Sequence, residues 1–227
     1  MITLHHLENS RSQRILWLLE ELGVDYTIKR YERDRKSSLA PPELTSIHPL
    51  GKSPVITDGG ATIAESGAII EYLLKHYDDG SLLPAEGTPE HLAYTYWLHY
   101  AEGTFMPLML LSLIVGRIES APMPFFAKPI AKGIASKVRG GYLDPNIQRN
   151  LEFMQQTLLA STWFCGERMT AADIQMSFPL EAAEVRCNLA EDYPQLAAAL
   201  ARMRDRPAYQ LALKKGGPYQ LMGRSNN

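Results

Sequence analysis

Gly51-Lys52-Ser53-Pro54-Val55-Ile56, followed by Ala64-Glu65-Ser66-Gly67-Ala68-Ile69-Ile70, is the part of the sequence that decides the fold. The first stretch predicts a loop that enters a short apolar strand through a proline, and the second predicts a corner between a strand and a helix. Asp58-Gly59-Gly60 lies between them and predicts a hairpin turn, because glycine accepts a positive φ.

The same two stretches predict a binding site. A bond from serine to proline can be cis, which would turn the backbone of Ser53 outward to pair with an extended ligand. Glu65 and Ser66 fall at the start of the predicted helix, where unpaired N–H groups bind carboxylates. The expected ligand is a small peptide that carries both an amine and carboxylates.

Composition limits the classes of function. The chain has 227 residues, of which 45% are hydrophobic and 21% charged, and its net charge of -2 gives no reason to expect a nucleic-acid partner. Its two cysteines, Cys165 and Cys187, are too far apart for a metal knuckle, so we assign them to packing and expect no metal site. The N-terminus lacks the apolar core of a signal peptide, and the longest apolar run, residues 105–115, is shorter than the ~20 residues that span a bilayer. We expect a cytoplasmic protein without stable membrane anchoring.

Residues 1–79 are predicted to form an α/β domain. Residues 2–7 are typical of a strand, a helix follows from Ser12 until Gly23 stops it, and residues 24–28 alternate as in a second strand. A polar segment, residues 32–46, leaves room for one helical turn before the hairpin and a last helix over residues 66–77. The predicted order is β-α-β-α-β-β-α, with the second helix reduced to a turn.

This order resembles the thioredoxin-like N-terminal domain of cytosolic glutathione transferases. Residues 47–55, Ile-His-Pro-Leu-Gly-Lys-Ser-Pro-Val, are similar to the loop that leads into the family's cis-proline, and residues 64–69 are similar to its Glu-Ser corner. The resemblance covers nearly the whole chain, is weakest over residues 119–141, and favours the serine-type, theta-, beta- or nu-like bacterial or fungal branch. It implies a homodimer that takes glutathione as co-substrate without another cofactor, and it implies that glutathione is bound by Lys52, Ser53, Pro54, Glu65 and Ser66.

Residues 80–88 are predicted to be a linker and residues 89–227 an all-α domain. A long apolar helix over residues 89–117 is expected to bend at Pro107. Isoleucines at 130 and 134 predict a short amphipathic helix with a basic face, and Asp144-Pro145 predicts a capped helix start. Thr170-Ala171-Ala172-Asp173 has the form of a capping box.

Transferases of this family hold glutathione as a thiolate, because the thiolate is the nucleophile. Lowering a thiol pKa from ~8.5 to ~6.5 requires about 2.7 kcal/mol, which one hydrogen bond to a charged sulfur can supply. In the serine-type transferases that this sequence resembles, the activating serine stands in the turn after the first strand, ahead of an arginine. Ser10 holds that place, four residues before Arg14. Ser12 and Asn9 remain alternatives, since Ser12 could instead be a helix N-cap and an amide also donates to sulfur.

The sequence therefore predicts a transferase that adds glutathione to small, mostly apolar electrophiles, with reduction of organic hydroperoxides as a second possible activity. No cysteine precedes Cys165, which argues against chemistry through a protein-bound mixed disulfide. The alternative is a non-catalytic adaptor with the transferase fold, which would have no need of the two binding stretches. Apolar side chains of the long helix are candidates for the electrophile site: Tyr100, Phe105, Met106 and Met109.

Overall fold

A four-stranded mixed sheet forms the first part of the chain in the computed structural model, which describes residues 1–34 and 37–221. Its strands are β1 (Ile2–Leu7), β2 (Tyr26–Tyr31), β3 (Val55–Asp58) and β4 (Ala61–Ala64), in the spatial order β2-β1-β3-β4. β1 runs parallel to β2 and antiparallel to β3, with Leu4 opposite both Ile28 and Ile56, and β3 forms the predicted hairpin with β4. The thioredoxin-like order of strands is confirmed.

Two helices cover this sheet. α1 (Ser12–Leu22) buries its apolar face and ends at Gly23, whose φ of 62° is the left-handed cap that the sequence predicted. α2 (Ser66–Tyr77) buries Ile69, Ile70, Leu73 and Leu74. The predicted helical turn in the polar segment is η1 (Pro42–Ser46), a 3₁₀ helix. Residues 78–88, between α2 and α3, contain no helix or strand, and the exact domain boundaries stay a prediction.

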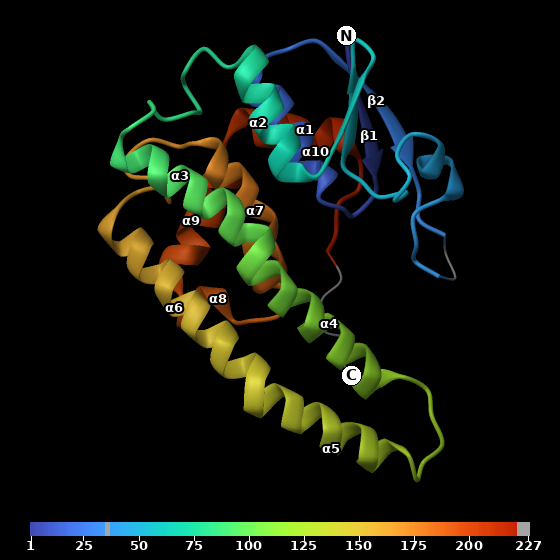
Figure 1. Ribbon diagram of the computed structural model, residues 1–227. Helices are drawn as coiled ribbons and strands as arrows, with labels where there is room; N and C mark the ends of the chain where they lie inside the picture. The colour runs from blue at the N-terminus through green and yellow to red at the C-terminus, as the bar shows by residue number, and fades with distance from the viewer. Residues whose placement is uncertain (35–36, 222–227) are drawn as a thin grey trace.

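Two long helices form a hairpin that extends away from the sheet (Figure 1). The first joins α3 (Pro89–Tyr100), the π-helical turn η2 (Ala101–Phe105) and α4 (Met106–Ser120). The second joins α5 (Lys128–Val138), the π-helical turn η3 (Arg139–Leu143) and α6 (Asp144–Ala160). The first is long and apolar enough to cross a membrane by length and composition alone, but its middle is part of the protein core, where Trp97, Ala101 and Phe105 are buried.

The prediction that Asp144 caps a new helix is wrong. Asp144 has helical dihedral angles, φ -61° and ψ -43°, and η3 leads into α6 without a break. Pro145 follows η3 as Pro107 follows η2, and the residue four positions before each proline is a glycine, Gly141 or Gly103. A proline ring clashes with the carbonyl of that residue in a regular α-helix, so a widened π-helical turn at this point lets both helices continue.

The remaining helices pack around α7 (Ala171–Glu184), which contacts α1, α2 and α3 and so joins the two parts of the chain. The predicted capping box at its start is confirmed, with Asp173 accepting from the backbone N–H groups of Thr170 and Phe164. α8 (Leu189–Asp192) and α9 (Pro194–Arg204) follow, and α10 (Pro207–Gly216) returns to pack against α1. Cys165 is buried, and burial raises the pKa of its thiol to about 12, as expected of a packing residue.

Candidate functional site

A cavity of about 760 Å³ lies between one end of the sheet, where β1 and β4 end and β3 begins, and the long helix. Residues from the loop before β3, the start of α2, the turn after β1 and the helix η2–α4 meet around it. Its polar wall is formed by Arg11, Arg33, Thr45, His48, Lys52, Ser53, Glu65, Ser66 and Glu102, and its apolar wall by Leu7, Leu39, Ala40, Pro41, Pro42, Leu50, Pro54, Ala64 and Leu110. All five residues predicted to bind glutathione line this one cavity.

The loop before β3 presents its backbone to the cavity. The Ser53–Pro54 peptide bond is cis. The Ser53 hydroxyl donates to the carbonyl of His5 at 2.8 Å and accepts from the N–H of Leu7 at 3.3 Å. Because the side chain of Ser53 is tied to β1, its backbone groups are the ones left for a ligand.

Glu65 lies at the corner between β4 and α2 with φ 71° and ψ 127°, a conformation that residues other than glycine rarely adopt. Its side chain is exposed and lines the cavity. Strain of this kind costs roughly 1–3 kcal/mol and is found mostly at functional sites. The corner therefore holds a carboxylate where local backbone preference would favour glycine.

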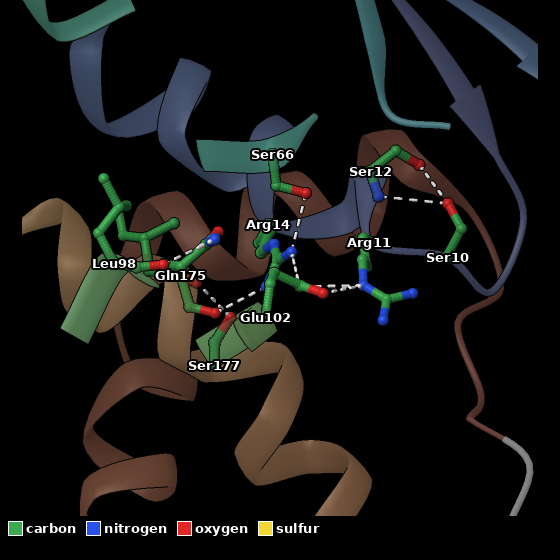
Figure 2. A network of polar contacts seen from close by, with 10 residues as sticks. Ser10, Arg11, Ser12, Arg14, Ser66, Leu98, Glu102, Gln175 and Ser177 are labelled. Carbon is green, nitrogen blue, oxygen red and sulfur yellow. Dashed lines mark hydrogen bonds and ion pairs between the residues drawn. The ribbon is translucent and has the colours of Figure 1, made fainter. Parts of the chain in front are cut away.

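Arg14 supports this corner from inside the protein (Figure 2). Its guanidinium is buried and donates to the Ser66 hydroxyl at 2.8 Å, to the carbonyl of Gln175 at 2.7 Å and to the carboxylate of Glu102. Since the Ser66 oxygen accepts from Arg14, the hydrogen of its hydroxyl remains to be donated to a ligand. The sequence marked Arg14 only as a neighbour of Ser10 and did not reveal this role.

Glu102 was missed by the sequence reasoning, although an acidic residue within an apolar helix was a visible signal. It comes from η2, and Arg11 donates to both of its carboxylate oxygens at 3.0 Å. Burial would raise the pKa of Glu102, but the charges and hydrogen bonds of Arg14 and Arg11 outweigh it and hold this pKa below its usual value. The carboxylate of Glu102, which lines the cavity, is therefore ionised at neutral pH.

The three candidate thiolate donors lie in the turn after β1. Ser10 donates to the carbonyl of Leu7 at 2.8 Å, and its oxygen is 2.8 Å from that of Ser12, which is fully buried and bonded to His6 at 2.9 Å. Asn9 is half-buried with φ 49°, and its Oδ1 accepts from the N–H of Gln220 at 2.7 Å. Leu7 and Arg11 flank this turn and line the cavity, whereas Asn9, Ser10 and Ser12 are not among the lining residues within the described part of the chain.

Comparisons with known proteins decide the family. A model described as the glutathione S-transferase N-terminal domain matches residues 1–75, and the corresponding C-terminal domain model matches residues 141–207. The chain is 38% identical over 215 residues to glutathione S-transferase 3 of Schizosaccharomyces pombe, covering 95% of this chain and 88% of that protein. It is 32% identical over 223 residues to glutathione S-transferase 1 of Saccharomyces cerevisiae, covering 95% of each. The chain belongs to the glutathione S-transferase family.

Solved structures of the glutathione S-transferase family agree. A glutathione S-transferase from Actinobacillus pleuropneumoniae has a TM-score of 0.78 and 35% identity, with 95% of this chain and 93% of that chain covered. A sphingomonad glutathione S-transferase complexed with glutathione has a TM-score of 0.71 and 23% identity, with 95% and 98% covered. The similarity to the sphingomonad protein shows that the two chains share a fold.

The apolar side chains predicted to face a second substrate of this transferase lie elsewhere. Tyr100, Phe105, Met106 and Met109 are all buried in the core, and the Tyr100 hydroxyl donates to Asn150. α4 reaches the cavity through Leu110, which is 52% exposed, and Ile114 and Ile118 continue the same exposed face at four-residue intervals. Because the helix is apolar on most of its surface, its sequence did not show which face would be buried and which would be exposed.

Proposed function

We infer that this glutathione S-transferase binds glutathione in the cavity beside Pro54 and Glu65 and transfers its sulfur to an electrophile. The observation that carries the proposal is the set of charged groups that line the cavity, which includes the carboxylates of Glu65 and Glu102 and the cations of Arg11, Arg33 and Lys52. Glutathione has one ammonium group and two carboxylates, so it can pair with both kinds of group. The sphingomonad relative, with the same fold, was solved with glutathione bound, which supports the proposal.

Each group of the peptide has a partner. Glu65 pairs with the γ-glutamyl ammonium, and Ser66 donates its hydroxyl to the adjacent carboxylate together with N–H groups at the start of α2. The backbone of Ser53 pairs with the cysteinyl residue, and Lys52 meets the glycyl carboxylate. In this proposed arrangement the sulfur lies toward the turn after β1.

The turn after β1 supplies the stabilisation of the thiolate. Ser10 is the proposed donor, with Asn9 and Ser12 as alternatives. To donate to the thiolate, the Ser10 hydroxyl gives up its hydrogen bond to the carbonyl of Leu7. The N-terminus of α1 and the guanidinium of Arg11 add favourable charge. The thiolate then forms a bond to the electrophilic carbon, and the leaving group departs with its electron pair, so the protein supplies orientation and electrostatics.

The electrophile is proposed to lie against Leu110, Ile114 and Ile118, because this exposed face of α4 continues from the cavity. An apolar wall beside the sulfur suits small apolar electrophiles. The protein is further proposed to work in the cytoplasm, in detoxification, as a homodimer. The apolar stripe of Phe126, Ile130 and Ile134, each at least 60% exposed, supports the dimer because such stripes usually mark interfaces.

Calorimetric titration with glutathione, followed by a conjugation assay with a chlorodinitrobenzene, tests the proposal. The wild-type protein is expected to bind glutathione and to ionise its thiol below the pKa of the free thiol, as read from the ultraviolet absorbance of the thiolate. Ser10→Ala is expected to raise that pKa, with Asn9→Ala and Ser12→Ala as comparisons. A wild-type protein that binds no glutathione would overturn the proposal.

A further inference from the structure

The chain continues past α10 as a short strap, residues 217–221, that crosses to the turn after β1. The end of α10 is held tightly where the strap begins. Lys215 bonds to Glu20 at 2.6 Å through its ammonium and accepts from Arg30 through its carbonyl. A Cβ on Gly216 would stand 2.6 Å from Oε1 of Gln13, so only glycine fits there without a shift. The strap therefore starts from a fixed point on α1 and β2.

Tyr219 fixes the middle of the strap. Its hydroxyl donates to the buried carboxylate of Glu181 at 2.5 Å, and Tyr209 of α10 donates to the other oxygen of the same carboxylate at 2.5 Å. Glu181 belongs to α7, which also contacts α1. Two hydroxyl donors on one buried carboxylate hold the strap and α10 together against α7.

Gln220 brings the strap to the candidate thiolate turn. Its backbone N–H donates to Oδ1 of Asn9 at 2.7 Å. A backbone N–H can only donate, so the atom of the Asn9 amide that faces the strap must be the oxygen. The amide nitrogen is therefore left as the donor on the side away from the strap. Arg33, a cavity residue, also holds this turn by donating to the carbonyl oxygens of Glu8 and Asn9 at 3.2 and 3.3 Å.

We propose that the C-terminal strap is a positioning element of the glutathione site, in which the Gln220 N–H fixes the Asn9 amide so that its nitrogen donates to the bound sulfur. The inference rests on the proposed glutathione site and deepens it, because it gives Asn9 a share in stabilising the thiolate. Gln220 acts only through Asn9. The strap joins the last described residues of the chain to a turn within its first ten, so the site depends on both.

Gln220→Pro tests this directly, because proline removes the N–H and leaves the rest of the strap in place. The variant is expected to raise the pKa of glutathione bound to the full-length protein by roughly half a unit to one unit and to lower kcat by roughly threefold to tenfold, the effect of one hydrogen bond. KM for glutathione is expected to change less than twofold, because Glu65, Ser66 and Lys52 are untouched. Leu221→Pro is the matched control: it introduces the same ring one residue later, keeps the Gln220 N–H, and is expected to leave the bound thiol unchanged.

A double variant separates positioning from general damage. In an Asn9→Ala background, Gln220→Pro is expected to cause no further rise in the pKa of the bound thiol, because the amide through which it acts is gone. If Gln220→Pro does not fold, a chain ending at Tyr219 replaces it, with a chain ending at Leu221 as its control. An unchanged thiol pKa in Gln220→Pro, or an equal rise with and without Asn9, would overturn the inference while a glutathione-binding wild type left the proposed function standing. A wild type without glutathione binding would overturn the proposed function itself.

Discussion

Glu65 combines an unfavourable backbone conformation with an exposed carboxylate, and the two can be separated by substitution. We expect Glu65→Gly to increase the free energy of unfolding by about 1 kcal/mol, because glycine adopts φ 71° without strain. The same change removes the proposed partner of the γ-glutamyl ammonium, so the affinity for glutathione is expected to fall roughly tenfold to a hundredfold. Urea denaturation and calorimetric titration measure the two quantities.

Glu65→Gln is the control for this prediction. It keeps the backbone conformation and nearly the same side-chain shape but removes the charge, so glutathione affinity is expected to fall without a gain in stability. If Glu65→Gly were no more stable than Glu65→Gln, the backbone at this corner would not be strained. If both kept full affinity, Glu65 would not contact the ligand.

His6 gives the stability a pH dependence. Burial, and then the charge of Arg30, lower the pKa of His6 from 6.5 to about 4, against an opposing backbone hydrogen bond with Gly216. Between these two values the unfolded chain binds a proton that the folded protein does not. The contribution of His6 is therefore present above pH 6.5 and is lost as the pH falls toward 4, by roughly 3 kcal/mol in total.

Urea denaturation between pH 4 and pH 7 measures this contribution when the wild type is compared with His6→Gln, whose amide can still hydrogen-bond to Ser12 and does not titrate. Asp173 acts in the opposite direction, because burial raises its pKa from 3.8 to about 6 and the folded protein then binds the extra proton. Both proteins contain Asp173, so the difference between them isolates His6. Parallel curves for the two proteins would contradict a lowered pKa at His6.

At the scale of elements, substitutions at the two predicted helix starts of the second half are expected to change the stability by different amounts. Asp173 is fully buried and accepts from two backbone N–H groups, whereas Asp144 is exposed inside a continuing helix. Asp173→Asn is expected to lower the free energy of unfolding by about 2 kcal/mol, because its NH₂ must face a buried donor. Asp144→Asn is expected to change it by less than about 0.5 kcal/mol. Urea denaturation of both variants checks the pair, and equal losses would mean that Asp144 caps a helix after all.

The elements that could be predicted are those specified by neighbouring residues. Gly23 ends α1, glycines 59 and 60 close the hairpin, and Thr170 with Asp173 starts α7, because each of these signals acts within a few residues. The Asp144-Pro145 pair gave a wrong prediction, because residues that are typical of a helix start can also follow a π-helical turn inside a continuing helix. Local pattern alone could not distinguish the two.

At the scale of the molecule, the site depends on contacts between distant segments that no local pattern reveals. The loop and corner proposed to bind glutathione could be recognised because they lie close together in the sequence. Arg14 joins Ser66 to Glu102 across the two parts of the chain, and the Gln220 N–H reaches Asn9 from the other end of it. No residue near Glu102 or Gln220 in the sequence indicates these partners. Which face of α4 is buried likewise depends on packing against distant segments, so the local sequence does not predict it.

The exposed stripe of α5 allows a prediction about assembly. Ile130 and Ile134 lie one turn apart on α5 and are 64% and 60% exposed, and Phe126, in the turn just before this helix, is 65% exposed. A second copy of the chain on this stripe would remove the three side chains from water, each contributing roughly 1.5–3 kcal/mol if fully buried. We expect the wild-type protein to sediment as a dimer, and the double variant Ile130→Glu/Ile134→Glu to sediment as a monomer at the same concentration.

Lys132→Glu is the matched control, because it changes the net charge by the same two units on the opposite side of α5. Two glutamates on the stripe would carry unpaired charges into the interface and repel their counterparts, which costs far more than the lost apolar contact. Lys132 stands away from the stripe by about half a helical turn, so its variant is expected to stay dimeric. Sedimentation velocity distinguishes the three proteins. A monomeric wild type, or a double variant that remains a dimer, would show that the second copy binds elsewhere or not at all.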